Sequence, residues 1–307
     1  MKQTSKKTSD PASPRQQNRW DWRAATNFIV GGAGGGLLLG VSLVALEPLA
    51  ARAAIFLGLA LIGSGLLCVW FEIGRPWRAL NVYRHFASSW MTREAVAAAL
   101  LFASGGLALL TLQAPLVLLT SSLGLAFVYC QARMLGANKG IPAWRQPRSI
   151  PLMLATGLAE GAGFLACILA ISNPAGGLWP LAVLLALILL RALFWKRFLA
   201  GLATGGAPDG SLQVLKGMDP GFMAFGHALP LLAVLGALTG IPGRAGLIFL
   251  AGTLVIACGW WFKFTLVRRA AFTQGLALLH LPMYGHGETD LPFRPGWKVA
   301  PGPGTGP

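Results

Sequence analysis

The chain has little charge and very few acidic residues. Only 11% of its 307 residues are charged, and it has ten Asp and Glu residues against 25 Lys and Arg residues. A soluble domain carries about 25% charged residues, so this chain lacks the side chains needed to cover a soluble surface. The composition therefore argues against a soluble globular protein.

Cysteine and histidine are also scarce. The four cysteines stand singly, and none belongs to a CxxC or CxxCH pattern. Iron–sulfur clusters and c-type haem need such grouped cysteines, so we expect neither in this chain. Of the four histidines only His227 falls within an apolar run, which leaves no helix-borne pair for a b-type haem. We therefore expect no haem, no iron–sulfur cluster and no other metal site.

Long uncharged runs dominate what is there. Ala24–Leu46 has 23 residues, Ala95–Ala132 has 38 and Gly161–Leu190 has 30. A membrane helix needs about 20 apolar residues, so each of the two longest runs can hold two passes. The sequence predicts an all-α integral membrane protein, a bundle of eight transmembrane helices. Their predicted spans are about 25–46, 52–72, 93–112, 115–134, 150–171, 179–199, 221–240 and 245–266.

The basic residues lie almost entirely on one side of this topology. Of the 25 Lys and Arg, 23 fall in the two ends and alternate loops, against Arg52 and Arg244 on the other side. The positive-inside rule therefore places both termini in the cytoplasm. The net charge of +15 reflects this orientation, so we expect no nucleic-acid partner. We divide the chain into a basic disordered tail (1–23), a membrane domain (24–267) and a cytoplasmic C-terminal tail (268–307), which either is disordered or straps a partner.

Two features inside the predicted spans invite functional interpretations. The glycine-rich run "GGAGGGLLLG" lacks the Lys-Ser/Thr of a phosphate-binding loop and lies in an apolar span, so it predicts close helix packing. Glu160 falls near the middle of the fifth span. An ionisable residue at that depth is either a protonated, hydrogen-bonded packing residue or an intramembrane proton site.

The loop between the second and third spans, within "FEIGRPWRALNVYRHFASSWMTREA", gathers ionisable side chains at one membrane depth. Simple explanations exist, because an acid stabilises a helix N-terminus and arginines anchor helices at the membrane surface. A quinone headgroup, however, exchanges two protons for every two electrons, and an acid or histidine can relay them. The hypothesis is a quinone-binding and proton-relay site formed by Glu72, Arg75, Arg78, His85 and Glu94.

The same loop resembles that of DmsC-type subunits, the membrane anchors of dimethyl sulfoxide reductase and related molybdopterin enzymes. More distantly it resembles the NrfD/PsrC group. The stretch from Arg133 through "IPAWRQPRSIPLM" (Ile141–Met153) is similar to the family's connection between spans four and five, and "NFIVGGAGGGLLLG" to its first helix. The resemblance covers roughly residues 25–270, and eight spans match the family's architecture.

This resemblance implies that the chain exchanges electrons between an iron–sulfur subunit and quinone, ubiquinone or menaquinone, without holding a metal itself. It puts a quinone-site acid at Glu94. The family's loop histidine falls on Glu72, which is a departure, although a carboxylate could still relay protons there. The connection between spans four and five then becomes the expected partner-docking segment, with Arg133, Trp144 and Arg145.

The arginine-bearing loop should face the cytoplasm, which fits the family branch with cytoplasmic molybdenum subunits. Its examples are SoeC-like anchors of sulfite dehydrogenase and the anchor of phenylacetyl-CoA:acceptor oxidoreductase. We thus expect an iron–sulfur subunit and a molybdopterin catalytic subunit on the cytoplasmic face of a bacterial inner membrane. Two alternatives stay open: a transporter or proton pathway that uses Glu160 and Arg191, and an inert membrane tether.

Overall fold

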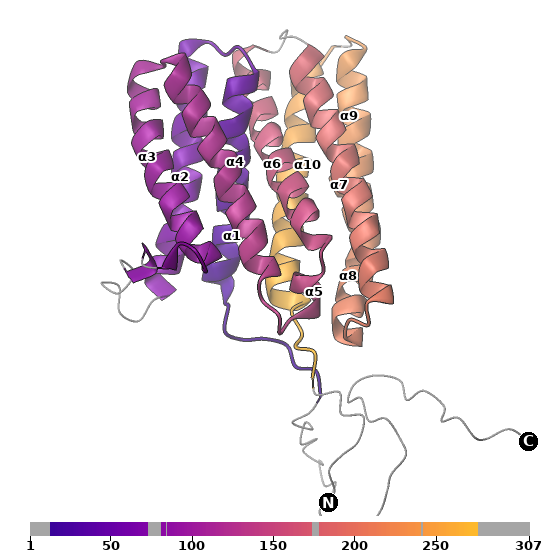
Figure 1. Ribbon diagram of the computed structural model, residues 1–307. Coiled ribbons are helices and arrows are strands. Elements are labelled where there is room, and N and C mark those ends of the chain that lie inside the picture. The colour runs from indigo at the N-terminus through magenta and orange to yellow at the C-terminus, as the bar shows by residue number, and fades with distance from the viewer. Residues whose placement is uncertain (1–12, 73–80, 84, 174–177, 241, 276–307) are drawn as a thin grey trace, which may run out of the picture.

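The computed structural model describes residues 13–72, 81–83, 85–173, 178–240 and 242–275. These residues include eight helical segments that are long and apolar enough to cross a membrane (Figure 1), which confirms the predicted all-α membrane bundle. A short helix, α5 (Pro142–Arg145), connects the fourth segment to the fifth. The eight segments are α1 (Trp22–Leu43), α2 (Pro48–Glu72), α3 (Trp90–Thr111), α4 (Ala114–Gly136), α6 (Ser149–Ser172), α7 (Leu178–Thr204), α8 to α9 (Asp209–Leu238) and α10 with η3 (Arg244–Arg269).

The seventh segment begins earlier than the sequence predicts. Helix α8 (Asp209–Met223) starts about twelve residues before the expected boundary near residue 221. Although α8 is more polar than the rest of the segment, one of its faces is buried. The buried residues recur at helical spacing: Ser211, Leu215, Met218 and Phe222. Residues expected in a loop therefore form the first turns of the helix. The segment continues through the π-helical η2 (Ala224–Ala228) into α9 (Leu229–Leu238).

Helix α1 lies in the middle of the bundle and packs against α2, α4, α6 and α10, with α7 to α9 beyond them (Figure 1). Its glycines make this possible. A Cβ atom built on Gly161 of α6 would lie 2.0 Å from the carbonyl carbon of Gly36 in α1. The two backbones are therefore in direct contact, which agrees with the packing interpretation of the glycine-rich run.

The two ends of the described chain pair with each other at one end of the bundle. Residues 13–21 and 267–275 run side by side, with an antiparallel bridge between Gln16 and Phe272. The Thr273 amide donates to the Arg15 carbonyl at 2.8 Å, and the Gln17 amide to the Ala271 carbonyl at 2.8 Å. This pairing, here named the terminal clasp, gives residues 13–21 a fixed course, although the sequence predicts them as part of a disordered tail.

The terminal clasp defines two ends of the bundle. The terminal end holds the clasp, α5 and the start of α3, and the far end holds the α1–α2 and α3–α4 connections (Figure 1). At the terminal end Asp21 caps α1, since its carboxylate accepts from the Arg23 backbone amide at 2.7 Å. The hydrogen bond from the Arg23 side chain lowers the pKa of the Asp21 carboxyl. The cytoplasmic location of the terminal end stays a prediction from the positive-inside rule.

Candidate functional site

Glu94 lies in the second turn of α3 and points into the bundle. The helix begins at Trp90, and Ser89 caps it by accepting from the Thr92 amide at 3.3 Å. Glu94 is only 4% exposed. A buried carboxyl group this close to a helix end does more than stabilise the helix dipole, because burial of an acid is costly without a specific partner.

Amide side chains from two other helices surround this carboxyl group. The Asn27 Nδ2 of α1 donates to Glu94 Oε1 at 3.2 Å. The Gln131 side chain of α4 lies close enough to interact with Glu94, and its Nε2 donates to the Asn27 carbonyl at 2.9 Å. All three side chains are buried, and together they form what we name the Glu94 site, where α1, α3 and α4 meet.

Asn27 and Gln131 were not predicted as site residues from the sequence, although each position carries a signal. Each is an amide inside an otherwise apolar run, where an unpaired polar side chain is costly and must find a partner. The structure supplies that partner in Glu94. Asn27 Oδ1 has no hydrogen-bond partner among the described residues, so the Glu94 site offers one free acceptor.

The other predicted loop residues do not join Glu94. Glu72 is the last residue of α2 and is partly exposed, and His85 is exposed in the connection before α3. Within the described ranges, neither side chain forms a hydrogen bond with Glu94. Arg75 and Arg78 lie outside the described residues.

Trp90 lies at the start of α3, near Glu94, and its ring contacts two arginine side chains. The guanidinium carbons of Arg93 and Arg133 are 4.2 and 4.5 Å from the centre of the Trp90 ring. Arg133 Nη1 also donates to the Tyr129 hydroxyl at 3.1 Å. Such cation–π contacts hold the ends of α3 and α4 together. Arg133, predicted to dock a partner, is thus half-buried next to the Glu94 site.

The two other predicted docking residues have different environments. Trp144 is 1% exposed; its Nε1 donates to the Leu266 carbonyl at 2.9 Å, and its ring stacks on Trp20 at 4.8 Å. Trp144 therefore supports the terminal clasp from beneath and cannot touch a partner directly. Arg145 is exposed, and its guanidinium donates to the Lys139 carbonyl at 2.8 Å and to Gln274 Oε1 at 2.6 Å.

A second group of buried charges lies deeper in the bundle. Glu160 of α6 and Lys263 of α10 form an ion pair at 2.5 Å, with both side chains at most 1% exposed. Arg191 of α7 is fully buried and donates to His227 Nε2 at 3.3 Å and to the Val255 carbonyl at 3.0 Å. The partner of Glu160 is thus Lys263, one of the 23 basic residues that the positive-inside pattern places in the two ends and alternate loops.

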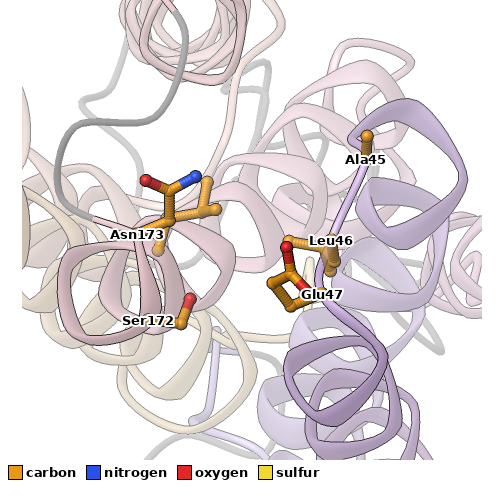
Figure 2. Close-up of a pocket in the computed structure, with 6 residues that line it drawn as sticks. Ala45, Leu46, Glu47, Ser172 and Asn173 are labelled. Atoms are coloured by element: carbon orange, nitrogen blue, oxygen red, sulfur yellow. The ribbon is translucent and has the colours of Figure 1, made fainter.

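The pocket drawn in Figure 2 lies away from all of these residues. It encloses about 120 Å³ at the far end, where Glu47 of the α1–α2 connection faces Ser172 and Asn173 at the end of α6 (Figure 2). Ala45, Leu46 and Leu169 complete its lining. Neither Glu94 nor Glu160 contributes to it, so this pocket is not the candidate site.

Fold and site together define a class of protein. The chain is an all-α, multi-pass membrane protein, and in the part of the chain that the structure describes no cluster of His, Cys, Asp or Glu could hold a metal ion. The family model for the DMSO reductase anchor subunit (DmsC) matches residues 31–200, more than half of the chain, so the chain belongs to this family. No curated protein matches it.

Family membership confirms the resemblance seen in the sequence. The chain is a membrane anchor subunit of a molybdopterin oxidoreductase, a role that implies association with a catalytic and an iron–sulfur subunit. The matched residues include Glu94, Arg133 and Glu160. Assignment to the branch with SoeC-like anchors stays a prediction.

Proposed function

We propose that the chain passes electrons between its iron–sulfur partner and the membrane quinone pool, and that the quinone headgroup binds at the Glu94 site. The observation that carries this proposal is the buried Glu94 carboxyl group, held by Asn27 one turn inside the terminal end. Membership of the DmsC family supports an exchange with quinone. We infer the entry of electrons from a cytoplasmic substrate, through the partners, into quinone.

The residues of the Glu94 site suit the proton exchange that quinone chemistry requires. Reduction of a quinone consumes two electrons and two protons, and an acid within hydrogen-bond reach of a headgroup oxygen can supply a proton. In the proposed site Glu94 gives up this proton, while Asn27 Nδ2 holds the carboxyl group in place. The free acceptor Asn27 Oδ1 could receive a hydrogen bond from a quinol hydroxyl.

The terminal end is the proposed docking surface for the iron–sulfur and molybdopterin subunits, on the cytoplasmic face of a bacterial inner membrane. The terminal clasp and the neighbouring connection before α6 carry exposed basic side chains, among them Arg145 and Arg269. A basic surface steers an acidic partner surface toward it. Because the Trp20 ring of the clasp stacks on the buried Trp144 ring, this surface has a fixed backbone, which lowers the cost of ordering it on binding.

The decisive experiment replaces Glu94 with Gln in the complex purified with its partner subunits. Gln keeps the size of the side chain and can bond to Asn27, but it cannot exchange a proton. We expect the complex to assemble and quinone turnover to fall by a factor of about 100 or more, the range for loss of a general acid. Reduced methyl viologen as electron donor and a short-chain quinone as acceptor give the readout.

Glu47→Gln is the matched control, because Glu47 is an exposed acid at the far end. We expect it to leave quinone turnover unchanged. Normal turnover in the Glu94→Gln complex would remove Glu94 from the site. A wild-type complex that itself fails to reduce quinone would instead favour the inert-tether alternative.

A further inference from the structure

The ion pair between Glu160 and Lys263 occupies space that two glycines leave open. A Cβ atom on Gly32 of α1 would lie 2.5 Å from Lys263 Nζ, and one on Gly259 of α10 would lie 2.3 Å from Glu160 Oε1. A side chain at either position would force the charged groups to move. Yet the pair is incompletely bonded, because Glu160 Oε1 has no hydrogen-bond partner among the described residues.

The charges around this pair do not balance when every group is ionised. Arg191 is fully buried, and it lies close enough to both Glu160 and Lys263 to interact electrostatically with them. Its hydrogen bonds go to His227 and to backbone carbonyls rather than to an acid. One buried negative charge thus faces two buried positive charges, and an uncompensated buried charge is costly.

Only Lys263 can relieve this imbalance by losing a proton. An arginine side chain keeps its proton in proteins, whereas a buried lysine can become a neutral amine. Loss of one proton from Lys263 would leave Glu160 and Arg191 as the only charged members, with no net charge. We name these three side chains the Glu160 cluster; within it, Lys263 is the cationic side chain that can give up a proton.

Polar groups connect the Glu160 cluster to the Glu94 site. Lys263 Nζ and Gln131 Oε1 approach the same glycine, at 2.5 and 3.6 Å from the position that a Cβ of Gly32 would occupy. Lys263 Nζ and Gln131 Oε1 are therefore no more than about 6 Å apart. The Gln131 side chain lies close enough to Glu94 to interact with it, while Gln131 Nε2 donates to the Asn27 backbone carbonyl and Asn27 Nδ2 donates to Glu94.

This connection leads toward one end of the bundle only. Glu160 lies eleven residues into α6, about 17 Å along the helix from the terminal end at 1.5 Å per residue. Beyond the Glu160 cluster and His227, which bonds to Arg191, the described residues toward the far end include no acidic or basic side chain until the rim residues Glu47, Arg52 and Arg244. The connection from the Glu160 cluster to the Glu94 site therefore leads toward the terminal end.

We propose that the Glu160 cluster stores one proton for the Glu94 site. This inference rests on the proposed function. After Glu94 has given its proton to a quinone oxygen, the Lys263 ammonium group releases a proton toward Gln131, and the Glu94 carboxylate accepts it. Lys263 becomes a neutral amine and Glu94 a neutral acid. A proton from water at the terminal end later restores the ammonium group, and both electrons come from the iron–sulfur partner.

Lys263→Arg tests the store directly, because arginine keeps the charge and can pair with Glu160 but does not release a proton. The assay measures quinone reduction by the purified complex, with reduced methyl viologen as donor, over a range of pH. We expect the variant to match the wild-type rate in acidic buffer and to be about tenfold slower in alkaline buffer, where free protons are scarce. A purely structural ion pair predicts the wild-type pH profile.

Ser121→Ala provides the matched control, since it removes a buried hydrogen bond to the Leu38 carbonyl that is not part of the path. Its pH profile should match that of the wild type. If the Lys263→Arg complex fails to assemble, Glu160→Gln takes its place. This substitution removes the negative charge that stabilises the protonated form of Lys263. The proton-store proposal would be contradicted if the variant's rate of quinone reduction had the same pH dependence as the wild type, or if it were lowered equally at every pH.

The result also separates this inference from the proposed function. If the wild-type complex does not reduce quinone, or if Glu94→Gln does not change the rate of quinone reduction, the proposed function is wrong. If quinone reduction depends on Glu94 but Lys263→Arg leaves its pH profile unchanged, only the proton store is wrong.

Discussion

The terminal and far halves of the bundle differ in the residues that form their interiors. The terminal half holds the buried polar side chains of the Glu94 site together with Lys263, and its apolar core contains aromatic residues, among them Trp144, Trp195 and Phe222. The far half has cores of aliphatic side chains, in which Ala and Leu predominate. The helices there approach each other through backbone contacts such as Gly36 with Gly161.

This difference shows how the fold can tolerate buried charge. In a membrane, close packing of small residues and backbones holds helices together, and the far half relies on it; its buried polar side chains include uncharged hydroxyls such as those of Ser104, Thr120 and Ser121. Buried charges are more expensive, and both Glu94 and Lys263 lie in the terminal half. Rigid packing in the far half thus supports a chemically active terminal half.

The largest expected effect comes from breaking the packing between α1 and α6. Gly161→Val would place a side chain 2.0 Å from the carbonyl carbon of Gly36, and backbone cannot move aside as a side chain can. We expect a loss of stability of about 3 kcal/mol or more, seen as little folded protein after purification in mild detergent. Gly106→Val is the control, because a Cβ on Gly106 meets no atom within 4 Å. Equal yields of the two variants would contradict the close contact.

A loss of stability of comparable size is expected from breaking the buried ion pair. Lys263→Met leaves Glu160 buried without its cation and should cost about 3–5 kcal/mol. The double variant with Glu160→Met as well should recover most of this loss, because an apolar pair of similar volume is often neutral or stabilising. Thermal unfolding of both variants in detergent measures the difference. Two independent, additive losses would show that the side chains do not interact.

The sequence predicted the membrane architecture because uncharged runs report directly on lipid-crossing helices. It also singled out Glu94 and Glu160, since acids are so rare in this chain that each one inside a span needs an explanation. The predicted start of the seventh segment was wrong because Asp209, Lys216 and Asp219 lower the hydropathy of α8, although the buried face of this helix is largely apolar.

The partners of the buried acids could not be predicted in the same way. Asn27, Gln131 and Lys263 come from three helices, and their meeting depends on how those helices rotate about their axes. That rotation is set by glycine contacts such as Gly32 with Lys263, which the sequence does not reveal. The burial of Trp144 likewise depends on the terminal clasp, because its neighbours Trp20 and Leu266 lie far away along the chain.

The smallest expected effect concerns an exposed ion pair in the terminal half of the bundle. Lys196 and Asp219 are 2.8 Å apart, and the lysine side chain is 52% exposed. Lys196→Met should therefore change stability by at most about 1 kcal/mol, because exposed ion pairs contribute little. Asp219→Leu should cost more than Lys196→Met, since the Asp219 carboxylate also accepts from Trp195 Nε1 at 2.7 Å and the buried indole would lose its partner. Thermal unfolding of the two variants measures the contrast. A Lys196→Met effect as large as that of Lys263→Met would mean that exposure does not separate the two kinds of ion pair in this bundle.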